Sequence, residues 1–101
     1  MDAKTLQAIA EPNRLKIIEL LQKQPLSVNE VALMLKLRQP QASKHLRTLT
    51  QAGLVSMRPR AQQRIYILNE EPFLRLEDWV HSFNAFWNQR LDNLDEYLKK
   101  G

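Results

Sequence analysis

The segment 38–53 carries polar residues whose types and spacing suit hydrogen bonding to DNA bases and phosphates. Read as a helix, it places Ala42, Leu46 and Leu49 in one narrow apolar stripe. The opposite face carries Gln, Ser, Lys and Arg side chains and no acidic residue, and side chains of these types bind base edges and phosphates. We interpret the segment as a DNA recognition helix. The alternative is an ordinary amphipathic helix with a solvated polar face.

The residues of this helix are expected to divide between base contacts and phosphate contacts. Phosphate contacts position a protein on DNA, whereas contacts to base edges carry the sequence preference. The residues expected to approach base edges are Gln39, Gln41, Ser43 and Lys44. The residues expected to hold phosphates are Arg38 and Arg47.

Positive charge is concentrated around this segment. The chain of 101 residues has a net charge of +4. Residues 36–64 hold seven Lys and Arg residues and no acidic residue, whereas residues 1–35 are neutral and residues 65–98 sum to −5. A contiguous basic block is typical of a surface that meets phosphates. A charge run is more often just a solvated face, so the block needs a structural context.

The segments before the recognition helix predict three short helices. The first covers residues 3–10 and the second covers about 12–23. Ser27 and Glu30 have the spacing of a capping box, which starts a third helix running to about residue 36. A very short turn then leads into the recognition helix, so the two form a helix-turn-helix. The apolar face expected for the second helix holds Leu15, Ile17, Ile18, Leu20 and Leu21.

Beyond Gly53 the sequence predicts a β-hairpin. Residues 54–58 and 64–68 are the expected strands, and residues 59–63 are the turn between them. Two strands this short are marginal alone, so they must pack on the helices. A basic hairpin directly after a recognition helix is typical of a wing that reaches the minor groove or the flanking backbone. The basic residues of this wing are Arg58, Arg60 and Arg64.

A long helix is expected near the end of the chain, from about residue 71 to residue 99. It carries two apolar stripes, and a small domain cannot hide both on so long a helix. We therefore expect one stripe to face a second copy of the chain, aided by the first helix. The alternative is that both stripes wrap the domain's own core. The residues expected at the dimer interface are Leu6, Ile9, Phe83, Phe86, Trp87, Leu91 and Leu94.

The composition argues against several function classes. The chain has no cysteine, and hence no disulfide and no thiolate metal site. It has no Gly-rich phosphate loop and no Ser-His-acid arrangement, so we expect neither an enzyme nor a cofactor. Asp78 and His81 lie one helical turn apart, which is only a partial set of zinc ligands, and we expect no metal site. No apolar run approaches the length of a membrane span, so we expect a single domain over residues 1–101 in the cytoplasm.

Several segments resemble one known family in order along the chain. Residues 10–21 resemble the "AxPxRxxIxxLL" helix of ArsR-type winged-helix repressors, and residues 27–32 resemble their "xxxELA" helix. Residues 39–49 closely match their "QPxVSKHLxxL" recognition helix, and residues 52–55 their "AGLV". The tail over residues 86–98 is similar to a cysteine-free branch that ends "FWxxRLDxLxxYL". For that branch the resemblance implies a DNA-binding homodimer joined by its terminal helices.

Two departures from the family pattern affect the expected site. Arg38 stands where the family usually has Ser or Thr, so the recognition helix loses a side-chain cap worth about 1 kcal/mol and gains a charge suited to phosphates. Ala61-Gln62 stands where the wing usually turns at a glycine, so a tight primed turn is not expected.

Together these patterns predict a mainly α-helical winged helix-turn-helix of about five helices with a two-stranded wing. The expected function is a transcriptional regulator, most simply a repressor, that binds a palindromic operator in double-stranded DNA as a homodimer. The alternative is a winged-helix protein-interaction module without DNA binding. The sequence identifies no small-molecule inducer and no membrane partner.

Overall fold

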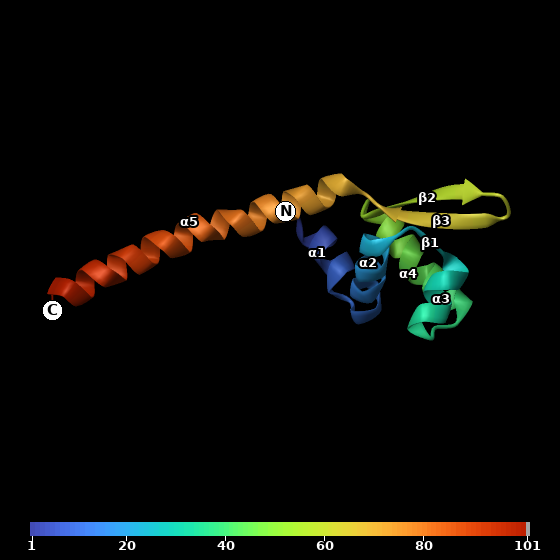
Figure 1. Cartoon of the computed structure of the whole chain (residues 1–101), viewed down its shortest axis with the longest axis horizontal. Coiled ribbons are helices and arrows are strands. Elements are labelled where there is room, and N and C mark those ends of the chain that lie inside the picture. The colour runs from blue at the N-terminus through green and yellow to red at the C-terminus, as the bar shows by residue number, and fades with distance from the viewer. Residues whose placement is uncertain (101) are drawn as a thin grey trace.

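The computed structural model describes residues 1–100, in which five helices and a three-stranded antiparallel sheet follow one another (Figure 1). The elements are α1 (Ala3–Ala10), α2 (Pro12–Lys23), β1 (Leu26–Ser27), α3 (Val28–Leu35), α4 (Gln39–Gln51), β2 (Val55–Arg60), β3 (Gln63–Leu68) and α5 (Glu70–Lys100). The first four helices and the sheet pack together, while α5 extends away from them, and the longest axis of the molecule is 69 Å.

Side chains at the helix starts explain where α2 and α3 begin. Glu11 precedes α2, and its carboxylate accepts a hydrogen bond from the backbone N–H of Arg14 at 2.8 Å. Ser27 and Glu30 form the predicted capping box, because each side chain accepts from the other residue's N–H, at 3.2 and 2.9 Å. Both signals act between residues three apart, so they require no contact with a distant part of the chain.

The turn between α3 and α4 depends on a residue in the left-handed conformation. Lys36 has φ 55°, and its N–H points to the last carbonyls of α3. Leu37 N–H donates to the Ala32 carbonyl at 2.9 Å, which closes the end of the helix. Gly53, just after α4, also has a positive φ, of 78°. Lys36 therefore sets the turn between α3 and α4, while Gly53 lies between α4 and β2.

The core lies where α4 meets α2, α3 and the sheet. The predicted inner stripe of α4 is buried, because Ala42, Leu46 and Leu49 are each fully excluded from solvent. One residue expected on the inner face of α2 was assigned wrongly: Leu15 is 43% exposed. Only part of the apolar face predicted for α2 packs against the core, and this part centres on Ile17 and Leu21.

The sheet has three strands, where two were predicted. The short segment β1 pairs with β3, with Leu26 opposite Tyr66, so the strand order is β1-β3-β2. The strands are also longer than expected: β2 runs to Arg60 and contains Pro59. Pro59 was predicted to lie in the turn, but it fits in β2 because β2 is an edge strand, where a missing N–H is tolerated.

The wing turn is tighter than predicted. Arg60 pairs with Gln63, so only Ala61 and Gln62 connect the two strands. Ala61 has φ 56°, and a positive φ at the first central residue is what primed two-residue turns require. The turn therefore forms without glycine, with alanine in a conformation that favours glycine.

The helix α5 has 31 residues, close to its predicted bounds, and it leaves the domain soon after it begins (Figure 1). Near its start Phe73 is half-buried against the core. From Trp79 onward every side chain whose placement is described is exposed, so the apolar stripes of this helix do not wrap the domain's own core. Within the described part of the chain, none of the helices is both long and apolar enough to cross a membrane.

Candidate DNA-binding surface

The recognition helix α4 turns its predicted polar residues outward. The side chains of Arg38, Gln39, Gln41, Lys44 and Arg47 are exposed, while Ser43 is half-buried. Because the buried stripe fixes the rotation of the helix about its axis, the opposite face must point away from the domain. The amphipathic pattern thus places these side chains where a ligand can reach them.

The first turn of α4 is capped in a way that the sequence did not indicate. Arg38 makes no side-chain cap, as expected, but its N–H donates to Gln41 Oε1 at 3.0 Å. Gln41 therefore forms one half of a capping box. Its amide NH2 group remains free to donate to a ligand, so Gln41 combines a capping role with its predicted contact role.

The structure brings residues of α4 and the wing together around one hollow. This space of about 360 Å³ is lined by Gln39 and Ser43 of α4, by Arg64 of β3, and by the start of α3. Asn29, Gln62 and Gln63 also line it, and sequence reasoning did not select them. In the sequence, only their positions could have indicated a place on this surface: Asn29 lies in the first turn of α3, and the two glutamines lie at the tip of a basic hairpin. No side chain that lines this hollow is acidic.

The three wing arginines do not share one face. Pairing of Pro59 with Arg64 and of Arg60 with Gln63 places Arg64 on one face of the hairpin and both Arg58 and Arg60 on the other. All three side chains are exposed. Arg60 lies instead beside a second hollow of about 810 Å³, which also contains Glu30. The sequence pattern predicted that all three arginines act together in the wing. In the structure, only Arg64 among them shares a hollow with α4.

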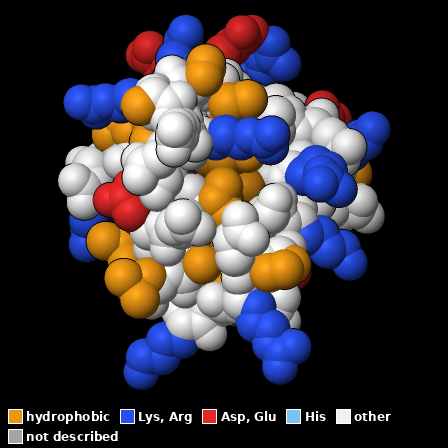
Figure 2. All heavy atoms as spheres, turned by 90° about the vertical axis from the view of Figure 1, so that its right-hand side faces the viewer, with side chains coloured by type: hydrophobic (Ala, Val, Ile, Leu, Met, Phe, Trp, Pro, Cys, Tyr) orange, Lys and Arg blue, Asp and Glu red, His pale blue; other side chains and the backbone are white. Residues whose placement is uncertain are grey.

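The end of the molecule that carries the wing turn and α3 is rich in basic side chains (Figure 2). Lys and Arg side chains project around the rim of this face, and fewer Asp and Glu side chains reach it. This is the distribution expected where a protein meets a phosphate backbone.

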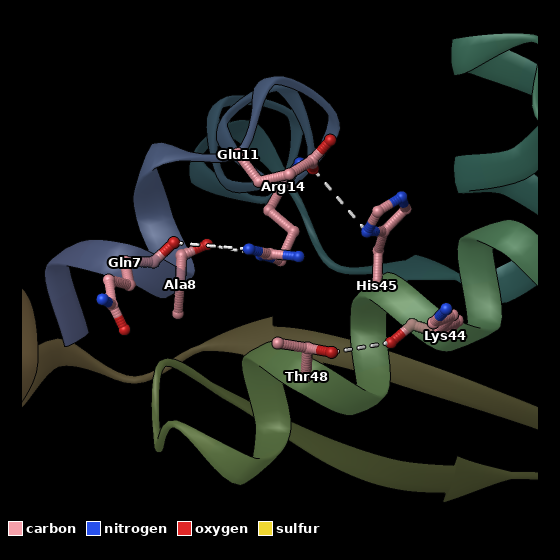
Figure 3. Close-up of polar contacts among 7 residues, drawn as sticks. All are labelled: Gln7, Ala8, Glu11, Arg14, Lys44, His45 and Thr48. Atoms are coloured by element: carbon pink, nitrogen blue, oxygen red, sulfur yellow. Dashed lines mark hydrogen bonds and ion pairs between the residues drawn. The ribbon is translucent and has the colours of Figure 1, made fainter. Parts of the chain in front are cut away.

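Behind the recognition helix, a group of polar side chains connects α4 to the junction of α1 and α2 (Figure 3). His45 Nδ1 lies 3.6 Å from Glu11 Oε2. Burial alone would raise the pKa of the Glu11 carboxyl, but N–H groups of Arg14 and Asn13 and the charges of His45 and Arg14 together hold this pKa below its usual value. The imidazole of His45 therefore faces a carboxylate across the boundary between α4 and the α1–α2 junction.

Asp78 and His81 do not form a shared site. His81 Nε2 lies 3.6 Å from Glu77, one turn earlier on the same helix, and its other ring nitrogen lies 3.3 Å from Asn84. Among residues 1–100, no cluster of three potential metal ligands occurs. These side chains are exposed and belong to the solvated face of α5.

The residues predicted for a dimer interface divide into two groups. The five on α5 are exposed, from 42% for Phe83 to 59% for Trp87 and Leu91. Leu6 and Ile9 on α1 are half-buried, and Ile9 packs against the core of its own chain. Exposed aromatic rings of α5 form two edge-to-face pairs, Trp79 with Phe83 and Phe86 with Trp87.

Comparison with known proteins identifies the family. Residues 11–57 match the model of the bacterial regulatory proteins of the arsR family. The chain is 35% identical over 85 residues to the HTH-type transcriptional regulator Rv2034 of Mycobacterium tuberculosis, covering 84% of this chain and 77% of that protein. It is 34% identical to the transcriptional activator HlyU of Vibrio cholerae, covering 83% of this chain and 78% of the relative.

A solved structure supports the same assignment. The homodimeric winged helix-turn-helix DNA-binding domain Mb0332 of Mycobacterium bovis, a possible ArsR-family regulator, superposes with a TM-score of 0.68. The identity is 28%, and the match covers 82% of this chain and 77% of that domain. The chain therefore belongs to the arsR family of bacterial regulatory proteins, whose members are transcriptional regulators and not enzymes.

Proposed function

We propose that the chain binds a palindromic operator in double-stranded DNA as a homodimer and represses transcription by covering the promoter. The observation that carries this proposal is the convergence of Gln39, Ser43 and Arg64 around one hollow without an acidic side chain. Amide and hydroxyl groups beside a guanidinium are suited to hydrogen bonding with base edges and phosphates together.

In this proposal the two parts of the surface have different tasks. Gln39, Gln41, Ser43 and Lys44 approach base edges in the major groove, and Arg38 and Arg47 hold the phosphates beside it. The wing residues Arg58, Arg60 and Arg64 contact the neighbouring backbone or the minor groove. Their exposed positions leave them free to make these contacts.

The homodimer is proposed from the apolar surface of α5. A single chain leaves Trp87, Leu91 and Leu94 more than half exposed, and a contiguous apolar surface on one protein marks an interaction site. The partner is a second copy because a palindrome is read by two equivalent helices, about 34–36 Å apart for successive major grooves. The homodimeric state of the Mycobacterium bovis domain supports this choice. Leu6 and Ile9 of α1 would border the interface.

The direction of regulation is part of the proposal. One relative is named an activator, so membership of the family does not by itself decide the sign. Repression by occlusion needs only DNA binding at the promoter, and we propose it as the simplest mode of action for a homodimer that binds an operator.

The test is a mobility-shift assay with an operator selected from random duplexes by the full chain. Wild type should bind this operator more tightly than a scrambled duplex, and Lys44→Ala should lose about 1–3 kcal/mol of that preference. Lys16→Ala, which removes an exposed lysine on α2 away from the proposed surface, is the matched control. If wild type binds no duplex even at low salt, the chain is a protein-interaction module and the proposal fails. An operator-linked reporter that rises on deletion of the regulator supports repression, and one that falls contradicts it.

A further inference from the structure

Three helices meet through a chain of polar contacts beside the recognition helix (Figure 3). Arg14 of α2 donates from Nε to the Ala8 carbonyl at 2.7 Å and from its terminal nitrogen to the Gln7 carbonyl at 3.3 Å. Glu11, between α1 and α2, accepts from the Arg14 N–H and faces His45 of α4. One series of contacts therefore runs from the end of α1 through the start of α2 to the recognition helix.

The contacts made by Arg14 restrain two helix ends. The last carbonyls of a helix have no partner within it, and the Arg14 guanidinium supplies one for α1. The first N–H groups of α2 have the same need, which the Glu11 carboxylate meets. The Glu11 carboxylate is held by the Arg14 N–H, so its position facing His45 does not depend on the contact with His45 alone. His45 lies next to Lys44 in sequence, so a restraint on His45 acts on the base-reading part of α4.

We propose that the contact between Glu11 and His45 is a protonation-dependent brace, which holds α4 against the α1–α2 junction and strengthens operator binding when His45 is protonated. The inference rests on the proposed DNA binding. Glu11 and His45 act as positioning residues, since neither belongs to the proposed DNA surface. A neutral imidazole contributes little at 3.6 Å from a carboxylate, whereas an imidazolium forms an ion pair.

The surroundings of His45 leave Glu11 as the group that decides this contact. Within residues 1–100, Glu11 is the one carboxylate in ion-pair distance of His45. The side chain of His45 is 19% exposed and that of Glu11 is 29% exposed, so water screens the pair only in part. Cations carried by the three helices that meet here are Lys44 and Arg47 on α4, Arg14 on α2, and Lys4 on α1. Lys4 and Arg14 line a small space beside α4.

The sequence contains a matched control for this contact. It has two histidines, and His81 on α5 also lies 3.6 Å from a glutamate, Glu77. That pair lies within one exposed helix and joins no two elements. The His81–Glu77 pair therefore has the same side-chain chemistry as the Glu11–His45 contact, but it does not connect two helices.

The experiment measures the affinity of the full chain for the selected operator between about pH 5.5 and pH 8, where histidine side chains change charge. The variants are His45→Gln, Glu11→Gln, the double variant and His81→Gln. Glu11→Gln retains a side-chain oxygen for the Arg14 N–H, so the cap of α2 is preserved. Thermal unfolding of each variant reports whether it is folded.

Lowering the pH from about 8 to about 5.5 should tighten operator binding by wild type and by His81→Gln. This tightening should exceed the change for a scrambled duplex by about two- to fivefold, the size expected of a partly exposed ion pair. His45→Gln and Glu11→Gln should each lose this excess, and the double variant should lose no more than either alone. The brace is rejected if the excess persists in His45→Gln, disappears in His81→Gln, or falls additively in the double variant. If wild type prefers no operator at any pH, the proposed DNA-binding function fails instead.

Discussion

Gln41 Oε1 accepts a hydrogen bond from the backbone N–H of Arg38 at 3.0 Å, so a residue predicted to read DNA also caps the helix that carries it. The cap uses the side-chain oxygen and leaves the NH2 group for a base or a phosphate. If Gln41 contacts DNA as proposed, one side chain at the start of α4 serves both the stability of the helix and recognition.

Two substitutions at Gln41 should separate these roles. Gln41→Ala removes the cap and the donor, and should lower the free energy of unfolding by about 0.5–1 kcal/mol and relax operator preference by about 1–3 kcal/mol. Gln41→Glu keeps the acceptor, so unfolding should be nearly unchanged while binding to every duplex weakens through repulsion by phosphates. Urea unfolding and mobility shifts measure the two effects. Operator preference equal to wild type in Gln41→Ala would exclude a base contact.

The wing should supply affinity that does not depend on DNA sequence. Arg60→Ala should weaken binding to operator and scrambled duplexes alike, and reduce the slope of log affinity against log salt by about one. Arg75→Ala is the control, because Arg75 pairs with Glu71 on α5 and lies outside the proposed surface. An unchanged slope in Arg60→Ala would show that this side of the wing does not touch DNA.

Trp87 is the most informative residue for the dimer. It is 59% exposed in a single chain, and burial against a partner would make Trp87→Ala cost about 3–5 kcal/mol of association free energy. Sedimentation equilibrium over a wide concentration range should show dissociation of this variant. Operator binding should weaken in parallel, since both half-sites must be read together.

Leu33→Ala is the matched control for the dimer, because Leu33 is 81% exposed on α3 and lies outside the proposed interface. This variant should sediment as wild type does. A wild type that remains monomeric at high micromolar concentration would overturn both the dimer and the palindromic operator.

The wing turn offers a stabilising substitution. Ala61 has φ 56°, where glycine is free of the steric cost that alanine meets. Ala61→Gly should therefore raise the free energy of unfolding by up to about 1 kcal/mol, reduced by the greater freedom of glycine in the unfolded chain. Gln62→Gly, at the neighbouring turn position, should give no such gain. Thermal unfolding compares the two, and equal shifts would argue against strain at Ala61.

The lowered pKa of Glu11 makes a prediction for acid stability. A carboxyl whose pKa is lower in the folded chain stabilises it above the unfolded pKa, and this contribution is lost as the pH falls through the folded value. Glu11→Gln should therefore unfold at a lower temperature than wild type at neutral pH. The difference should shrink below the usual glutamate pKa of 4.5. Glu19→Gln, which changes an exposed carboxylate within α2, is the control. A difference for Glu11→Gln that stays constant with pH would reject the linkage.

Much of the recognition unit could be predicted from the sequence because its signals are local. Ser27 and Glu30 are three residues apart, and their capping box forms within one helical turn. The stripe of Ala42, Leu46 and Leu49 required only helical periodicity to identify the inner face of α4. The polar face of α4 and the start of α3 then followed from backbone geometry alone.

Other features were decided by contacts between distant parts of the chain. Leu26 pairs with Tyr66, which makes β1 a strand that no local pattern indicated. Pro59 is accommodated in β2 only because nothing pairs with its outer edge. Leu15 belongs to an apolar run but remains exposed, since the neighbours of α2 cover only part of that face.

Local patterns were enough to place the helix starts, the polar face of α4 and the apolar residues of α5, because these depend on residues within a few turns of one another. Packing between distant segments brings Arg64 to the same hollow as Gln39 and Ser43, and turns Glu11 toward His45. These side chains are far apart in sequence. Their proximity depends on how the helices and the hairpin pack around the core, a relationship that no local spacing encodes.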